Sequence, residues 1–255
     1  APATLYPRLL LLLDAGARAS VIESHSGAGA YLANAVCEIR LGDAAELTHL
    51  RIQQDSADSV HIAQASLTLG AHAAYHARVF SLGEGMARYE ISARLLGEGA
   101  SLDLAAASLG YGRGHFDVTS VIEHAVRGPR SRQLVKCVLG GRGRGVYQGK
   151  VRVARGAVAT DAHQLSRALL LSPTAEANLK PELEIFADDV KCGHGATVGE
   201  LDGEALFYLR SRGIPLQAAR RLLIQAFVGE VLDRVADEGL RAYASRAVDA
   251  ALAKL

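Results

Sequence analysis

The stretch that decides the fold is a strand pattern followed at once by a tight turn. It reads Tyr89-Glu90-Ile91-Ser92-Ala93-Arg94-Leu95-Leu96-Gly97-Glu98. Its apolar residues, from Tyr89 to Leu95, alternate with polar ones, and successive side chains of a strand point to opposite faces. Gly97 supplies the backbone freedom that a sharp change of direction requires. The stretch therefore predicts a strand with one buried face that ends at a turn.

Similar glycine-containing turns recur through the N-terminal part of the chain. They are centred on Gly16, Gly42, Gly70 and Gly97, at spacings of 26, 28 and 27 residues, and Gly83 lies midway in the last interval. Such a repeat is typical of a solenoid, and the midway turn indicates two strands per coil. An ordinary antiparallel sandwich is the alternative, although it does not require constant spacing. After Gly110 the repeat cannot be followed.

The pattern changes from strands to helices near residue 201. Asp202 is placed to cap a helix, and Gly213 is placed to end it. Pro215 can open a second helix, which continues with apolar residues at helical spacing, and a third helix is expected over residues 240–255. The sequence thus predicts a mainly β protein, with a β-helix core domain at residues 1–200 and a helical module at 201–255.

The composition limits the classes of protein that fit. Of the 255 residues, 49% are hydrophobic but only 5% are aromatic, so small aliphatic side chains must fill the core. A formal net charge of +1 gives no general attraction to nucleic acid. Three cysteines without close pairing favour a reducing, cytoplasmic compartment. The leucine run at residues 9–13 is too short for a membrane span, which takes about 20 residues, and predicts a buried strand.

Most motifs of enzymes are missing from the sequence. There is no Walker loop, no Cys-x-x-Cys and no His-Glu-x-x-His, and the glycines at 141–145 lack the following helix of a dinucleotide-binding turn. A polysaccharide enzyme built on a β-helix is also disfavoured, because Trp and a persuasive carboxylate pair are lacking. The sequence therefore does not favour an enzyme.

Cys192-Gly193-His194 is the one constellation that could bind a metal. On a strand the thiol and the imidazole would share a face, and both suit iron, an iron–sulfur cluster or zinc. Two ligands cannot close a tetrahedral site, so others would have to come from elsewhere. A buried thiol beside a hydrogen-bonded histidine is the alternative. Cys37 and Cys137 are expected to be packed thiols.

Residues 126–160 carry many Arg and Lys residues and no acidic residue. This segment is either an anion- or RNA-binding strip or the solvated face of the solenoid. Tyr147 is its only aromatic residue, and nucleic-acid strips need aromatic side chains for base stacking, so the solvated face is favoured. The remaining histidines are scattered along the chain and are expected to be surface or packed residues.

Several long blocks, all in one order between residues 145 and 234, resemble the SufB/SufD family of iron–sulfur cluster assembly proteins. The blocks are Gly145-Val146-Tyr147-Gln148-Gly149-Lys150-Val151, Thr160-Asp161-Ala162-His163-Gln164, Leu169-Leu170-Leu171-Ser172, Lys180-Pro181-Glu182-Leu183-Glu184-Ile185, Ala187-Asp188-Asp189-Val190-Lys191-Cys192-Gly193-His194-Gly195-Ala196-Thr197-Val198-Gly199 and Leu206-Phe207-Tyr208-Leu209-Arg210-Ser211-Arg212-Gly213-Ile214. The block around Cys192 is similar to the SufD branch of the family. The helical segment that usually precedes the family's solenoid is not found in this chain.

The resemblance implies a right-handed parallel β-helix and a non-catalytic scaffold subunit. It implies pairing with a SufB-like subunit through the end of the β-helix, and docking of a SufC-like ATPase on the helical module. Cys192 and His194 would lie near the first interface and hold iron or a cluster transiently, with no cofactor bound stably by the isolated chain. The ATPase contacts would be Phe207, Tyr208, Arg210 and Arg212. The alternative is a self-associating β-helix that forms a homodimer; neither nucleic acid nor a membrane is an expected partner.

Overall fold

The segments with alternating side chains form strands, and every strand pairing that the structure describes is parallel. The structure is a computed structural model that describes residues 3–254. The strands are β1 (Ala3–Leu5), β2 (Arg8–Leu13), β3 (Arg18–Gly27), β4 (Tyr31–Leu41), β5 (Glu46–Asp55), β6 (Val60–Leu69), β7 (Ala74–Ser81), β8 (Met86–Leu95), β9 (Ser101–Gly110), β10 (His115–His124), β11 (Arg130–Leu139), β12 (Arg144–Val153), β13 (Asp161–Leu170), β14 (Glu176–Ile185) and β15 (Lys191–Glu200).

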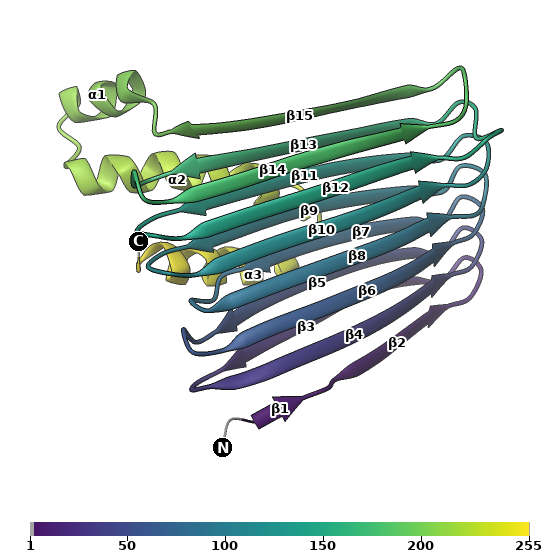
Figure 1. The fold of residues 1–255 in the computed structure, drawn as a ribbon, viewed down its shortest axis with the longest axis horizontal. Helices are drawn as coiled ribbons and strands as arrows, with labels where there is room; N and C mark the ends of the chain where they lie inside the picture. The colour runs from purple at the N-terminus through teal and green to yellow at the C-terminus, as the bar shows by residue number, and fades with distance from the viewer. Residues whose placement is uncertain (1–2, 255) are drawn as a thin grey trace.

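The strands stack into two facing sheets that together make a β-solenoid (Figure 1). One sheet has the order β1-β4-β6-β8-β10-β12-β14, with β2 also beside β4, and the other has the order β15-β13-β11-β9-β7-β5-β3. Consecutive strands alternate between the sheets, so each coil contains two strands. The predicted solenoid is therefore confirmed, and the antiparallel sandwich is wrong.

The turns recur at a constant spacing because each one stacks on the turn before it. The N–H of Gly70 donates to the carbonyl of Leu41 at 2.9 Å. A Cβ at Gly97 would lie 2.0 Å from the backbone nitrogen of Ala71, so no larger residue fits there. The repeat continues beyond Gly110, where the N–H of Gly140 donates to the Gly110 carbonyl at 2.8 Å. The glycines at 141–145 thus belong to a solenoid turn and the strand after it.

Small aliphatic side chains fill the space between the sheets, as the composition predicts. Ile39, Leu67 and Ile91 are buried there, together with many alanines. The leucine run forms β2, but Leu10 and Leu12 are 56% and 60% exposed, so the prediction of a buried strand is wrong for that face. The reason is position, because β2 lies at the edge of its sheet with β4 on one side.

Three helices follow the last strand: α1 (Gly203–Ser211), α2 (Leu216–Leu232) and α3 (Glu238–Leu252). As predicted, Asp202 caps α1, accepting the N–H groups of Glu204 and Ala205 at 2.9 and 3.2 Å. Residue 255, the last of the predicted third helix, lies outside the described residues. No described helix has the length and apolar character needed to cross a membrane.

The second and third helices cover the outer face of the β15-to-β3 sheet, whereas α1 lies beyond the strand ends (Figure 1). Ile224 and Val228 of α2 and Val248 of α3 share one apolar cluster with Phe80 and Leu134 of the sheet. No residue of α1 is buried. The helices thus fasten to the side of the solenoid and leave its end uncovered.

Candidate functional site

The candidate site lies in the last coil, where β15 forms the edge of its sheet. Lys191 to Val198 are extended, and β15 pairs only with β13 among the described strands. Gly193 faces outward, because a Cβ there would lie 3.3 Å from the ring of the exposed His163. Cys192 packs partly against the interior core, so Cys192 and His194 both face inward. The shared face predicted for the pair is confirmed.

The thiol and the imidazole differ in their access to solvent. Cys192 is half-buried, whereas His194 is exposed at the open end of the solenoid. Burial raises the pKa of the Cys192 thiol, the nearby Asp161 charge acts in the same direction, and a hydrogen bond with the backbone of Ala162 opposes them. The thiol is therefore protonated at neutral pH and would release its proton on binding a metal.

The pair does not complete a metal site by itself. Within residues 3–254, no three His, Cys, Asp or Glu side chains converge in a way that could hold a metal ion. Cys37 and Cys137 are buried thiols on β4 and β11, and burial raises the pKa of each to about 12. They are packed thiols, as predicted. What this chain offers is two ligands on an exposed edge strand.

The predicted ATPase contacts on α1 are all on the surface. Phe207 and Tyr208 are 75% and 57% exposed, so these two rings do not pack on the solenoid. The Arg212 guanidinium lies 5.1 Å from the Tyr208 ring centroid, which orients both side chains, and Arg210 is also exposed. The result is a small aromatic and basic surface.

Neighbouring acidic residues pair with much of the basic segment at 126–160. Arg132 pairs with Asp161 at 2.6 Å, and Lys150 pairs with Glu184 at 2.7 Å. Arg144 lies 3.4 Å from Glu176. These three acidic partners belong to the next coil, which thus neutralises part of the basic segment. The arrangement fits the solvated face rather than a strip for nucleic acid.

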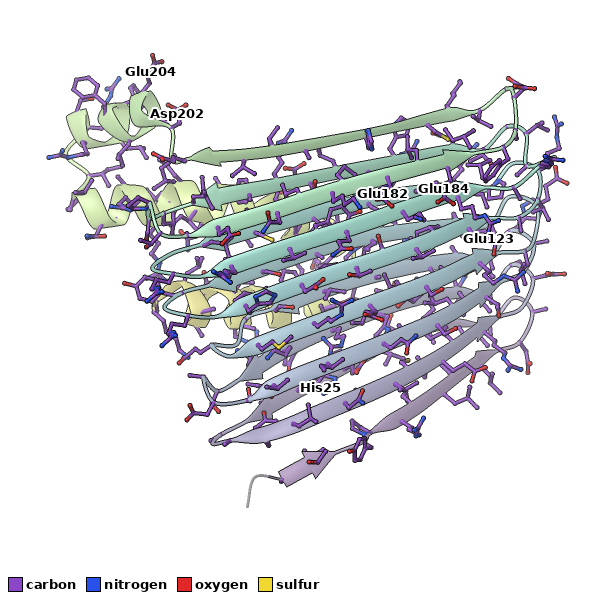
Figure 2. All side chains as sticks on the ribbon, in the orientation of Figure 1. His25, Glu123, Glu182, Glu184, Asp202 and Glu204 are labelled. Carbon is purple, nitrogen blue, oxygen red and sulfur yellow. The ribbon has the colours of Figure 1, made fainter. Side chains whose placement is uncertain are left out.

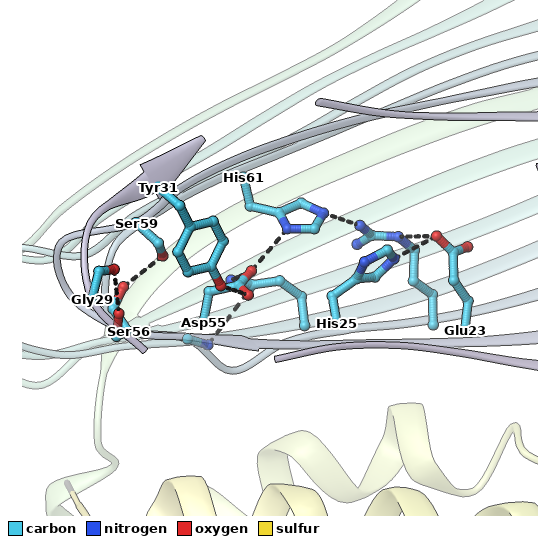
Figure 3. Close-up of polar contacts among 11 residues, drawn as sticks. Glu23, His25, Gly29, Tyr31, Asp55, Ser56, Ser59 and His61 are labelled. Atoms are coloured by element: carbon cyan, nitrogen blue, oxygen red, sulfur yellow. Dashed lines mark hydrogen bonds and ion pairs between the residues drawn. The ribbon is translucent and has the colours of Figure 1, made fainter. Parts of the chain in front are cut away.

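A buried polar network at the opposite end of the solenoid was missed by the sequence analysis. The ring nitrogens of His61 lie 2.6 Å from Arg51 and 2.8 Å from Asp55. Figure 3 shows His61 beside Asp55 and Tyr31. Arg51 also lies 3.6 Å from Glu23, which contacts His25. The signal was present, because the inward positions of β5 are polar at every second residue from 49 to 55.

Charged contacts hold this network together, although Nε of Arg51 is buried without a hydrogen-bond partner within residues 3–254. Arginine can only donate, so Nε2 of His61 accepts from Arg51 and Nδ1–H donates to Asp55. Burial raises the pKa of Asp55, but hydrogen bonds from His61, Tyr31 and Gln53 outweigh it and lower that pKa to about 2. His61 therefore keeps no free nitrogen for a ligand. Figure 2 shows His25 of this network far from Glu182 and Glu184 of β14.

Comparisons with known proteins agree with this architecture. A family model described as "SUF system FeS cluster assembly, SufBD core domain" matches residues 1–227. An iron–sulfur cluster assembly SufBD family protein of Synechocystis is 38% identical over 92% of this chain and 54% of its own length. The iron–sulfur cluster assembly protein SufD of Escherichia coli is 37% identical over 93% of this chain and 57% of its own. A chloroplastic protein of Arabidopsis thaliana is 36% identical over 92% and 50%. The chain thus spans about half the length of these relatives.

Proposed function

Because the chain belongs to the SufBD core family of iron–sulfur cluster assembly proteins, we propose that it is a non-catalytic scaffold subunit. In this proposal, the open end of the solenoid pairs with a SufB-like subunit, and α1 docks a SufC-like ATPase. The cluster is cargo, held transiently at the interface between the two solenoids.

The observation that carries the proposal is the incomplete ligand pair on an edge strand. Cys192 and His194 share the inward face of β15, and the chain brings no third ligand to them within the described residues. An edge strand presents unpaired N–H and C=O groups that can pair with another chain. A partner that adds to this edge would bring its own ligands beside Cys192 and His194. A site whose ligands come from two chains suits a cluster that is held only transiently, because separation of the subunits would remove some of the ligands and release the cluster.

The surface on α1 supports the second contact. Exposed aromatic and arginine side chains are the residue types that dominate protein interfaces. Phe207, Tyr208 and Arg210 are exposed on α1, a helix without a buried residue, and the exposed Arg212 caps its C-terminus. A motor bound there could move α1 relative to the last coil, where Cys192 and His194 lie.

The test is reconstitution of cluster assembly with a SufB-like subunit and a SufC-like ATPase. We expect His194→Ala to lower the assembly rate by at least about tenfold, because removal of a metal ligand should cost no less than removal of an outer-shell partner. His163→Ala is the matched control, since this exposed histidine lies on the neighbouring strand but faces outward. It should assemble clusters at the wild-type rate.

Two results would contradict the proposal. One is an unchanged assembly rate for His194→Ala in a complex that contains all three subunits. The other is failure of the folded chain to bind the ATPase during co-purification. The alternative, a self-associating β-helix without a cluster role, predicts a homodimer that light scattering still detects after the SufB-like subunit is added.

A further inference from the structure

A column of polar side chains lies directly behind His194 inside the solenoid. Strand register places Gln164 of β13 beside His194, and Gln133 of β11 beside Gln164. Gln133 and Gln164 are 3% and 2% exposed. In earlier coils the same column holds Leu104 and Ala77. One coil before Ala77 the column holds His49, which is also buried. The column is therefore polar at both ends and apolar between them, and Gln133 and Gln164 form the polar part next to His194.

Gln164 is held from the opposite sheet. The Tyr147 hydroxyl of β12 donates to Oε1 of Gln164 at 2.9 Å, and Nε2 of Gln164 donates to the Glu182 carbonyl of β14 at 3.0 Å. Gly149 provides the space, since a Cβ there would lie 2.1 Å from the Tyr147 hydroxyl and 2.2 Å from Oε1 of Gln164. The amide therefore spans the interior and has a fixed orientation.

This fixed amide retains unused hydrogen-bonding capacity. A primary amide has two N–H donors and two acceptor lone pairs, and the bonds to Tyr147 and Glu182 use one of each. The next layer of the column is His194, at the inter-strand spacing of about 4.8 Å. Both polar atoms of the Gln164 amide already have one partner, so a hydrogen bond to the imidazole would use the N–H or lone pair that remains.

Packing alone does not explain the polar column. A buried amide without full partners is unfavourable, whereas an apolar side chain in its place would be tolerated, as Leu104 is two coils earlier. Gln133 illustrates the point, because its Nε2 is buried and has no partner among the described residues. Its Oε1 accepts from Ser120 at 2.6 Å and lies 3.3 Å from the Tyr147 hydroxyl. Gln133 thus supports the phenol that in turn holds Gln164.

We propose that Gln164, held by Tyr147 and the Glu182 carbonyl, is a positioning residue for His194. Its amide hydrogen-bonds one ring nitrogen, which fixes the tautomer and leaves the other nitrogen to face the iron or cluster. The role in assembly rests on the function proposed above, whereas the hydrogen bond can be tested in the isolated chain.

The first measurement is the tautomer ratio of His194, from ¹³C and ¹⁵N histidine NMR of the isolated chain, with the signals assigned by their loss in His194→Ala. We expect one tautomer to dominate in the wild type. Gln164→Met has a similar length but no amide, and it should reduce the ratio about fivefold, the value of one net hydrogen bond. Gln133→Met, one coil further away, should have a smaller effect.

The second measurement is the cluster assembly rate of the complex, which should be about tenfold lower for Gln164→Met. Tyr147→Phe removes only a hydroxyl, so it tests the inference even if Gln164→Met fails to fold, and it should shift both measurements in the same direction. Equal tautomer ratios in the wild type and both variants would overturn the inference, whatever the assembly rate. A shifted ratio with an unchanged rate would support the hydrogen bond but remove His194 from the proposed function.

Discussion

His124 shows how the interior of the solenoid changes the chemistry of a single residue. Its side chain is fully buried, and Nε2 lies 2.9 Å from the Ser131 hydroxyl. Burial lowers the pKa of this imidazole to about 4, against the opposing effects of a hydrogen bond to the backbone carbonyl of Pro129 and of the Asp161 charge. Between about pH 6.5 and this value, only the unfolded chain takes up the proton, so stability falls as the pH decreases.

This titration predicts a pH-dependent effect of His124→Gln. Between pH 7 and pH 5 the wild type should lose about 2 kcal/mol more unfolding free energy than the variant, because the other histidines with lowered pKa values, His61 and His76, titrate in both proteins. Urea unfolding of both proteins at the two pH values measures the difference. Asp55, with a pKa of about 2, titrates below this range and does not interfere. Parallel losses in the two proteins would contradict the prediction.

At the residue scale, the sequence pattern predicted which face of a strand a side chain occupies, but not which side chains of other strands it contacts. The spacing of Cys192 and His194 was enough to place both on one face, because strand geometry depends only on the chain itself. The meeting of Arg51 and Asp55 of β5 with His61 of β6 depends on how these two strands face each other across the interior, which the alternating pattern of each strand does not specify. Gln164 is similar, since its partners Tyr147 and Glu182 belong to two other strands.

At the scale of elements, a buried lysine fixes α2 to the sheet. Lys136 of β11 is 3% exposed, and its ammonium donates to the Phe227 carbonyl at 2.8 Å. It also pairs with Glu230 and lies 4.4 Å from the Phe227 ring centroid. Removal of one partner from a buried pair leaves an uncompensated charge, which is worse than removal of the charge itself.

Glu230→Gln should therefore destabilise the protein more than Lys136→Met does. We expect a loss of about 1–2 kcal/mol for Glu230→Gln, reduced from a fully buried pair because Glu230 is nearly half exposed, and a smaller loss for Lys136→Met. Glu176→Gln is the control, since its pair with Arg144 is exposed and should contribute less than about 1 kcal/mol. Chemical denaturation ranks the three variants, and the reverse order for the first two would contradict the argument.

The repeat was recognisable from the sequence only while its turns shared one chemistry. The turns at Gly42, Gly70 and Gly97 place glycine where the backbone approaches the preceding turn closely. The left-handed turn position does not mark the coils either, because Ala44 and His72 occupy it in early turns with a φ of 56°, and Ala159 and Asp189 occupy it in late ones at 57° and 53°. The strands continue in the later coils, but the glycines that mark the turns of the early coils do not recur there at the same spacing.

At the scale of the whole molecule, the helices α2 and α3 bury an apolar face of the solenoid that would otherwise be exposed to solvent. Leu50, Ile52 and Phe80 lie on the outer face of their sheet, yet they are almost fully buried because α2 and α3 cover them. Burial of each such side chain contributes roughly 1.5–3 kcal/mol. One face of the solenoid thus depends on the helices, whereas the end that carries His194 does not.

A chain that ends at residue 201 should consequently lose stability and associate. It would expose Leu50, Ile52 and Phe80 as one apolar surface, and such a surface promotes association in water. We therefore expect a lower melting temperature and a larger mass by light scattering. Replacement of Phe207 and Tyr208 by serine is the matched control, because both rings are already exposed, and its melting temperature should equal that of the wild type. A truncated chain that stays monomeric and melts with the wild type would show that the sheet is stable uncovered. In that case α2 and α3 would serve only to hold α1 beside the open end.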